Sequence, residues 1–102
     1  MKDGDTGMIT DLLKFTIKEG SMEAAAELMK KQTKNDLGDE GCLMAEAFRS
    51  KTDANTIFLL LGWENQAAID KHLKTAHDLL FRENLDPLLA APPIFFDWET
   101  IS

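Results

Sequence analysis

Two histidines are the side chains of this sequence best suited to acid–base chemistry, and they lie five positions apart, at His72 and His77. An imidazole loses its proton near neutrality, which suits a general base. On one continuous helix, a step of five residues turns the second side chain about 140° away from the first. Neither a third histidine nor a nearby cysteine completes a set of zinc ligands. We therefore predict no metal site.

The segment Thr75-Ala76-His77-Asp78 adds a second possibility, because it fits the capping pattern [ST]-x-x-[DE]. A helix that starts at Thr75 would interrupt the preceding one, and both rings could then reach a common cavity. The alternative for His72 is a residue at the edge of the core, bonded to a backbone carbonyl. The alternative for His77 is an exposed residue in a first helical turn.

Three other residues are candidates, each with a plainer alternative. Trp63 ends an apolar segment, where an indole either completes the core or lines a pocket. Arg82 could stabilise an oxyanion, or it could be a surface residue paired with Glu83 or Asp86. Asp11 interrupts an apolar strand pattern, and it is either a buried acid with a raised pKa or a residue near a frayed strand start.

The composition indicates one small, acidic, globular domain. The chain has 102 residues, of which 44% are hydrophobic and 28% charged, and its formal net charge is −7. A surface of this sign repels phosphate backbones and anionic lipids, so we expect neither nucleic acid nor membrane partners. The lone cysteine, Cys42, cannot form an intramolecular disulfide.

The start of the chain is polar and rich in glycine, unlike the apolar core of a signal peptide. We therefore predict a mobile leader over residues 1–7, a single domain over residues 8–102, and a cytoplasmic protein.

Hydrophobic periodicity predicts four strands and two helical regions. A helix begins after Gly20-Ser21 and fades between residues 35 and 41, and a second begins at the cap Asn65 and restarts at Thr75. Asp86-Pro87 resembles a further cap. The predicted strands are Met8–Lys18, Cys42–Ser50, Thr56–Glu64 and Ile94–Ile101. The order β-α-β-β-α-β predicts an α+β, ferredoxin-like fold, with a four-stranded antiparallel sheet and both helical regions on one face.

The segment from Ile57 to Trp63 is apolar on both sides of the pleat. Two helical regions cover one face of a sheet only, and the chain is too short for a third layer. We therefore predict a homodimer whose sheets pack face to face.

Three segments, Gly41-Cys42-Leu43, Gly62-Trp63-Glu64-Asn65 and the stretch from His72 to His77, give the chain a resemblance to the antibiotic biosynthesis monooxygenase family. The pattern W-E-S-x-x-x-L-x-x-H-L-x-T-P-H is frequent in that family. The resemblance to the family extends from Met8 to the last predicted strand, which is nearly the whole chain. The residues kept here are Trp63, Glu64, His72, Leu73, Thr75 and His77, with Ala76 in place of the usual proline. The resemblance implies a dimeric α/β-barrel with a cavity between sheet and helices in each subunit.

The family is mixed in activity, and its functional positions are only partly kept. Members that oxygenate anthrones use an Asn and a Tyr where this chain has Leu59 and Ile69, and a Trp and an Arg that match Trp63 and Arg82. The heme-degrading members use an Asn, a Trp and a His at the positions that hold Leu13, His72 and Arg82 here. None of the three matches, so heme degradation is disfavoured. The closest local likeness is to the quinol monooxygenases, although Leu61 replaces a common acid.

The resemblance therefore implies a monooxygenase that uses O₂ on a small electron-rich aromatic of the quinol or anthrone type, without metal, flavin or other cofactor. We expect His72 to be the base, with His77 as the second candidate, and Arg82 to hold the developing anion. The alternative is a non-catalytic member of the same superfamily that binds a small molecule in an apolar cavity. Beside Trp63, which could stack on a flat ring, the expected substrate-binding residues are Asp11, Leu13, Phe48, Leu59, Leu61 and Phe81.

Overall fold

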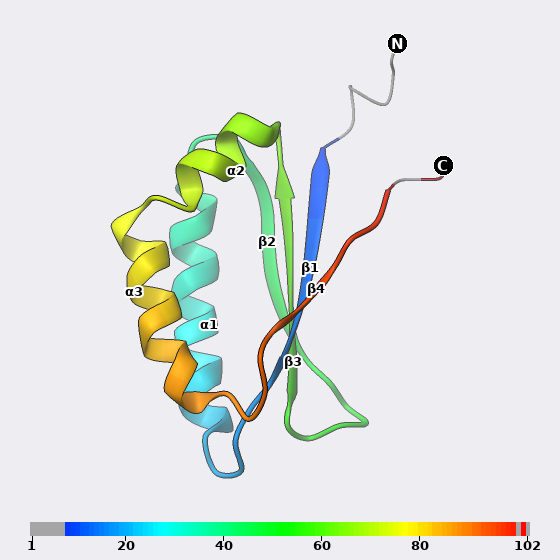
Figure 1. Ribbon diagram of the computed structural model, residues 1–102, viewed down its shortest axis with the longest axis vertical. Helices are drawn as coiled ribbons and strands as arrows, with labels where there is room; N and C mark the ends of the chain where they lie inside the picture. Colours follow the sequence, from blue (N-terminus) through cyan, green and yellow to red (C-terminus); the bar gives the residue numbers. More distant parts are fainter. Residues whose placement is uncertain (1–7, 100, 102) are drawn as a thin grey trace.

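The structure is a computed structural model that describes residues 8–99 and 101, so the predicted leader lies outside the described residues. Three α-helices pack on one side of a four-stranded sheet (Figure 1). Along the chain the elements are β1 (Ile9–Thr16), α1 (Met22–Leu37), β2 (Cys42–Arg49), β3 (Thr56–Trp63), α2 (Gln66–His72), α3 (Ala76–Leu85), the 3₁₀ turn η2 (Asp86–Leu88) and β4 (Ile94–Phe96).

The sheet confirms the predicted ferredoxin-like arrangement. Its strands run in the order β2-β3-β1-β4, and every neighbouring pair is antiparallel. The two central strands pair over their full length, from Ile9 opposite Trp63 to Thr16 opposite Thr56. Since side chains alternate along a strand, this register places Asp11 and Leu61 side by side on one face.

The last strand is shorter than predicted. Only Ile94–Phe96 pairs with β1, whereas the sequence predicts a strand up to Ile101. Beyond Phe96, the Trp98 indole N–H donates to the backbone oxygen and to the hydroxyl of Thr10, at 3.1 and 2.9 Å. A side-chain contact thus holds this segment to β1 where the strand ladder stops.

The second helical region is interrupted as its sequence predicts. The Asn65 side chain accepts a hydrogen bond from the Ala68 N–H at the start of α2, and the Thr75 hydroxyl accepts one from the Asp78 N–H at the start of α3. Each cap satisfies an N–H that has no partner inside its helix. The break between the two helices lies between His72 and His77.

The helices bury one face of the sheet and leave the other open. On the helix side, Leu59, Leu61 and Trp63 of β3 are buried, whereas Phe58 and Leu60 on the opposite side are only half-buried. The open face also carries Phe48, which is 48% exposed. These apolar side chains are the ones that the predicted second copy would cover, and the homodimer stays a prediction. In the described residues, no helix combines the length and the apolar character needed to cross a bilayer.

Candidate functional site

A cavity of about 300 Å³ lies between the sheet and the helices. Its walls are mainly apolar, with polar groups contributed by both the sheet and the helices, which is the usual character of a small-molecule site. The apolar lining is Leu13, Phe15, Leu59, Leu61, Trp63, Ile69, Leu73, Phe81, Leu85, Leu89, Pro93 and Phe95, and the polar lining is Asp11, Gln32, Asp36, His72, Asp78, Arg82 and Asp86.

Eight of the ten residues expected from the sequence line this cavity, and Phe48 and His77 do not. Phe48 pairs with Phe58 across β2 and β3, and strand alternation places both on the open face of the sheet. Phe48 therefore cannot stack on a ring in the cavity. His77 lies behind the cavity wall, at the start of α3. Asp11 does face the cavity, which the sequence leaves open because it depends on strand register.

Trp63 and His72 form the wall at the α2 end of the cavity. Trp63 is 1% exposed, and its ring lies 4.7 Å from the His72 ring between centroids, at an angle of 42°. The indole N–H of Trp63 is buried and has no hydrogen-bond partner among the described residues. Trp63 is thus both a core residue and a pocket residue, and its unpaired N–H is a potential donor to a ligand.

His72 is held between two carboxylates. Its Nδ1 lies 2.7 Å from Asp39 Oδ2, and its Nε2 lies 3.3 Å from Asp78 Oδ1. Burial alone would lower the pKa of His72, but the hydrogen bonds to Asp78 and Asp39 and the charge of Asp36 raise it to about 9. At neutral pH His72 is therefore an imidazolium paired with Asp39 and Asp78, a state that favours stabilising a nearby negative charge through its own charge over removing a proton.

His77 shares the same carboxylate from the other side. Its Nε2 lies 2.8 Å and 2.9 Å from the two oxygens of Asp39, and its Nδ1 lies 3.3 Å from the Gln32 amide nitrogen. The rings of His72 and His77 are 5.7 Å apart between centroids. The break at Thr75 thus brings together two rings that one continuous helix would turn apart.

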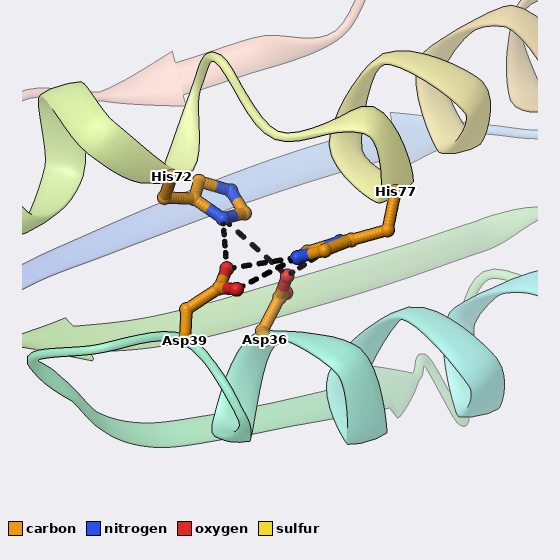
Figure 2. A group of neighbouring side chains, drawn as sticks. All are labelled: Asp36, Asp39, His72 and His77. Atoms are coloured by element: carbon orange, nitrogen blue, oxygen red, sulfur yellow. Dashed lines mark hydrogen bonds and ion pairs between the residues drawn. The ribbon is translucent and has the colours of Figure 1, made fainter.

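The carboxylates come from the end of α1 and the loop after it. Figure 2 shows Asp36 on the last turn of the helix and Asp39 just beyond it, both pointing toward the two rings. Gly41 then turns the chain into β2 with φ +83°, and a Cβ added there would collide with Ala68 of α2. Only glycine combines that backbone conformation with so close an approach. The turn thereby keeps Asp39 near α2.

The pKa of Asp36 is raised and the pKa of Asp39 is lowered, because burial dominates at Asp36 and hydrogen bonding at Asp39. Burial, reinforced by the charges of Asp39 and Asp78, raises the pKa of Asp36 to about 6 against the pull of the two histidines. Burial also acts upward on Asp39, but the hydrogen bonds from His72 and His77 overcome it and hold the pKa of Asp39 below its usual value. On the sheet side, burial raises the pKa of Asp11, although the charge of His72 opposes this.

Arg82 lines the cavity and pairs with an acid that the sequence did not suggest as its partner. Its Nε lies 3.0 Å from Asp78 Oδ2, one helical turn earlier, and an outer guanidinium nitrogen donates to the Leu73 carbonyl at 3.2 Å. The sequence alternatives for its partner, Glu83 and Asp86, are not the ones used. Arg82 therefore fixes Asp78, and Asp78 in turn fixes His72.

The family model for antibiotic biosynthesis monooxygenases matches residues 8–84, which is more than half of the chain. The chain belongs to this family. The matched part extends from β1 almost to the end of α3. It therefore contains the break at Thr75, both histidines and most of the cavity wall.

Solved structures agree on the fold. A Nitrosomonas europaea protein named for the antibiotic biosynthesis monooxygenases is 18% identical, with a TM-score of 0.88 over 94% of this chain and 92% of the other. A conserved Bacteroides thetaiotaomicron protein of unknown function is 26% identical, with a TM-score of 0.81 over 91% and 99%. A conserved Methanosarcina mazei protein is 17% identical, with a TM-score of 0.84 over 90% and 91%. The comparison with curated proteins gave no match.

Within the matched family domain, sequence reasoning missed three acids: Asp36, Asp39 and Asp78. Asp36 and Asp39 fall in the Asn-, Asp- and Gly-rich stretch that we used only to end a helix. Asp78 was used as a capping residue, yet its backbone N–H makes the cap while its carboxylate turns to His72. Acids three apart at a helix end were the available signal. Together with the histidines, Asp36 and Asp39 form a group of the kind that can hold a metal ion.

Proposed function

We propose that this protein is a cofactor-independent monooxygenase that acts with O₂ on a small electron-rich aromatic of the quinol or anthrone type. The observation that carries the proposal is the mainly apolar cavity of a family member, into which Asp11, His72 and Arg82 bring a few charged groups. Apolar walls suit a flat aromatic ring, and the charged groups suit its hydroxyl oxygens. Perturbed titratable groups in a cavity are the usual accompaniment of catalysis.

In this proposal the aromatic ring lies against Trp63 and Phe81, which are both buried in the cavity wall. Offset or edge contacts between aromatic rings contribute about 0.5–1.5 kcal/mol beyond the area they bury. The unpaired indole N–H of Trp63 could then bond a substrate oxygen. These contacts would orient the ring without taking part in the chemistry.

We assign the removal of the phenolic proton to Asp11 and the stabilisation of the resulting anion to His72. Burial raises the pKa of Asp11 above its ordinary value, although the charge of His72 opposes this, and a higher pKa strengthens the carboxylate as a base. The pKa of His72 is raised to about 9, so its ring carries a positive charge near the anion and does not accept the proton. The sequence predicts His72 as the base, whereas in this proposal Asp11 is the base and His72 stabilises the anion. Arg82, which also lines the cavity, supports the same charge.

The reaction requires no electron donor besides the substrate. The deprotonated aromatic passes an electron to O₂, and the radical pair combines at a ring carbon to give a peroxide. The ring carbon that carries the peroxide then loses its hydrogen as a proton while the O–O bond breaks, so that one oxygen atom stays on the ring as a carbonyl and the other leaves as water. The protein's part is to keep the anion dry and correctly oriented, which a mainly apolar cavity can do.

Oxygen uptake by the chelator-treated protein on reduced naphthoquinols and anthrones tests the proposal. We expect uptake above the autoxidation blank, a loss of about 10²-fold or more in Asp11→Asn, and near-parent rates in Asp70→Asn. Asp70 is an exposed acid on α2, so this control makes the same chemical change outside the cavity. Parent-like turnover in Asp11→Asn would show that another group is the base. Turnover that also survives the His72→Ala, His77→Ala double variant would exclude the histidines.

A binding protein of the same superfamily is the second candidate, favoured by the leucines at 59 and 61 in the cavity wall. It would hold an aromatic ligand without consuming it. Thermal stabilisation by the same quinols, with no O₂ uptake and with the ligand recovered unchanged, would identify a binder.

We also propose that the protein is a homodimer joined through the open face of the sheet. Apolar side chains at Phe48, Phe58 and Leu60 favour covering that face. Sedimentation equilibrium should give twice the chain mass, and Phe48→Glu should weaken the dimer by at least tenfold. Leu79→Glu, on an exposed site of α3, is the matched control. An unchanged dimer in Phe48→Glu would place the interface elsewhere.

A further inference from the structure

We propose that Asp36, Asp39, His72 and His77 bind one divalent transition-metal ion of the Zn²⁺ or Co²⁺ type. The site lies where the end of α1 meets the break between α2 and α3, behind and partly within the cavity wall. It goes beyond the proposed oxygenation, which requires no metal.

The four side chains already present their donor atoms to one point. One ligand atom from each lies within 4.8 Å of all the others. Asp39 lies 2.7 Å from His72 Nδ1 and 2.8 Å from His77 Nε2, and Asp36 Oδ1 lies 3.7 Å from the same His72 nitrogen (Figure 2). The 4.0 Å contact of Asp36 with His77 is to the other ring nitrogen, Nδ1. Tetrahedral zinc with bonds of about 2.1 Å needs ligand atoms roughly 3.4 Å apart. The most distant of these ligand atoms would therefore have to approach one another by about 1.4 Å to enclose an ion.

A second observation concerns Asp36, whose side chain is 1% exposed. One of its carboxylate oxygens, Oδ2, is buried and has no hydrogen-bond partner among the described residues. The other oxygen accepts from the Gln32 amide at 2.8 Å. A buried acceptor without a donor is costly, and a cation bound through Oδ2 would satisfy it. Oδ1, the oxygen in contact with the two rings, would keep its bond to Gln32.

His72 also has the outer support that a metal-binding histidine needs. Such a histidine usually donates its second ring N–H to a carboxylate, which fixes the ring and its tautomer. The Nε2 of His72 lies 3.3 Å from Asp78, and Arg82 holds that carboxylate from the other side. The Nδ1 of His72 is then the atom left for the ion.

The charge at this point favours a cation. The 16-residue helix α1 ends at Leu37, so the negative end of its dipole lies beside Asp36 and Asp39. In the structure the histidines supply the compensating N–H groups. An ion would replace the ring protons directed at Asp39 and release them to solvent, as is usual when histidines bind metals.

The donor set selects the class of ion. Two imidazole nitrogens with two carboxylate oxygens suit Zn²⁺, Co²⁺ and Ni²⁺, whereas Ca²⁺ and Mg²⁺ prefer oxygen alone. Four protein ligands fill a tetrahedral shell, which is typical of a structural site. Such an ion would tie α1 to the α2–α3 break, and it would fix His72 in the cavity wall.

The test is a titration of the chelator-treated full chain with Co²⁺, monitored by visible ligand-field absorption. Equilibrium dialysis measures the Zn²⁺ stoichiometry. We expect saturation at one ion per chain and displacement of Co²⁺ by Zn²⁺ but not by Mg²⁺. Because neither readout depends on turnover, failure here would leave the proposed oxygenation untouched.

Variants assign the ligands. Asp39→Asn and His77→Gln should each weaken Co²⁺ binding by more than tenfold, and Asp78→Asn by about 10–100-fold, as expected for an outer partner. Glu40→Gln is the control, because Glu40 is the adjacent exposed acid and pairs with Lys71. Far-UV circular dichroism establishes that each variant is folded. No saturable absorption with Co²⁺, or equal affinities in Asp39→Asn and Glu40→Gln, would overturn the proposal.

Discussion

The two halves of α1 bury opposite kinds of side chain beneath the same helical layer. The first half buries Met22, Ala25 and Met29, and all three belong to the hydrophobic core. The second half buries Gln32 and Asp36, which belong to the polar network around the histidines. The same helical periodicity therefore produces a core at one end and a charged cluster at the other.

The difference separates the part of the fold that supplies stability from the part that uses it. Burying an aliphatic side chain contributes about 1.5–3 kcal/mol, whereas a buried polar group costs free energy unless it is well bonded. The Oδ2 of Asp36 is buried without a partner. Departures of this kind from the rules of stable packing are expected at functional sites, where they are compensated elsewhere in the fold.

The largest expected effect separates the two halves by a core deletion. Met29→Ala removes a side chain that is 2% exposed, and we expect it to reduce the free energy of unfolding by about 2–5 kcal/mol. Because Met29 lies outside the charged cluster, the ring signals of both histidines in NMR spectra should stay nearly unchanged. Urea unfolding and a histidine pH titration measure the two effects.

Leu37→Ala is the control for this deletion, since Leu37 is 52% exposed on the same helix and should change stability by no more than about 0.5 kcal/mol. Large changes in the histidine signals of Met29→Ala would show that the two halves are coupled rather than separate.

The sequence predicts these two halves unequally well. Met22, Ala25 and Met29 lie at helical spacing, and such periodicity is a local property that a single sequence displays. The same holds for the caps at Asn65 and Thr75, which depend on residues three positions apart. Fold class and the helix break were therefore predictable from the chain alone.

The charged cluster was not predictable to the same degree, because it joins residues far apart in the chain. Asp39 meets His72 across 33 positions and His77 across 38. Nothing local distinguishes Asp39 from a residue that only ends a helix. Phe48 shows the converse case, since an aromatic residue on a strand faces the cavity or the open side according to register alone. Tertiary pairing decides both, and periodicity does not report it.

The smaller expected effect tests the charged half through its pH dependence. Burial raises the pKa of Asp36 from 3.8 to about 6, so the folded state holds this proton more tightly than the unfolded chain does. The resulting stability is present below about pH 4 and is lost as the pH rises through 6. Asp36→Asn removes that loss, because the neutral amide does not ionise and its oxygen can still accept from Gln32. In chelator-treated protein, the variant should match the parent at pH 4 and exceed it by roughly 2–3 kcal/mol at pH 8, at about 1.4 kcal/mol per pKa unit.

Urea unfolding at the two pH values measures this difference, with Asp70→Asn as the exposed control that should show no such pH dependence. A variant less stable than the parent at pH 8 would mean that the ionised Asp36 is held by His72 more strongly than burial opposes it. In that case the second half of α1 would stabilise the fold as an ion-pair network, and the contrast with the Met29 half would be one of chemistry and not of cost.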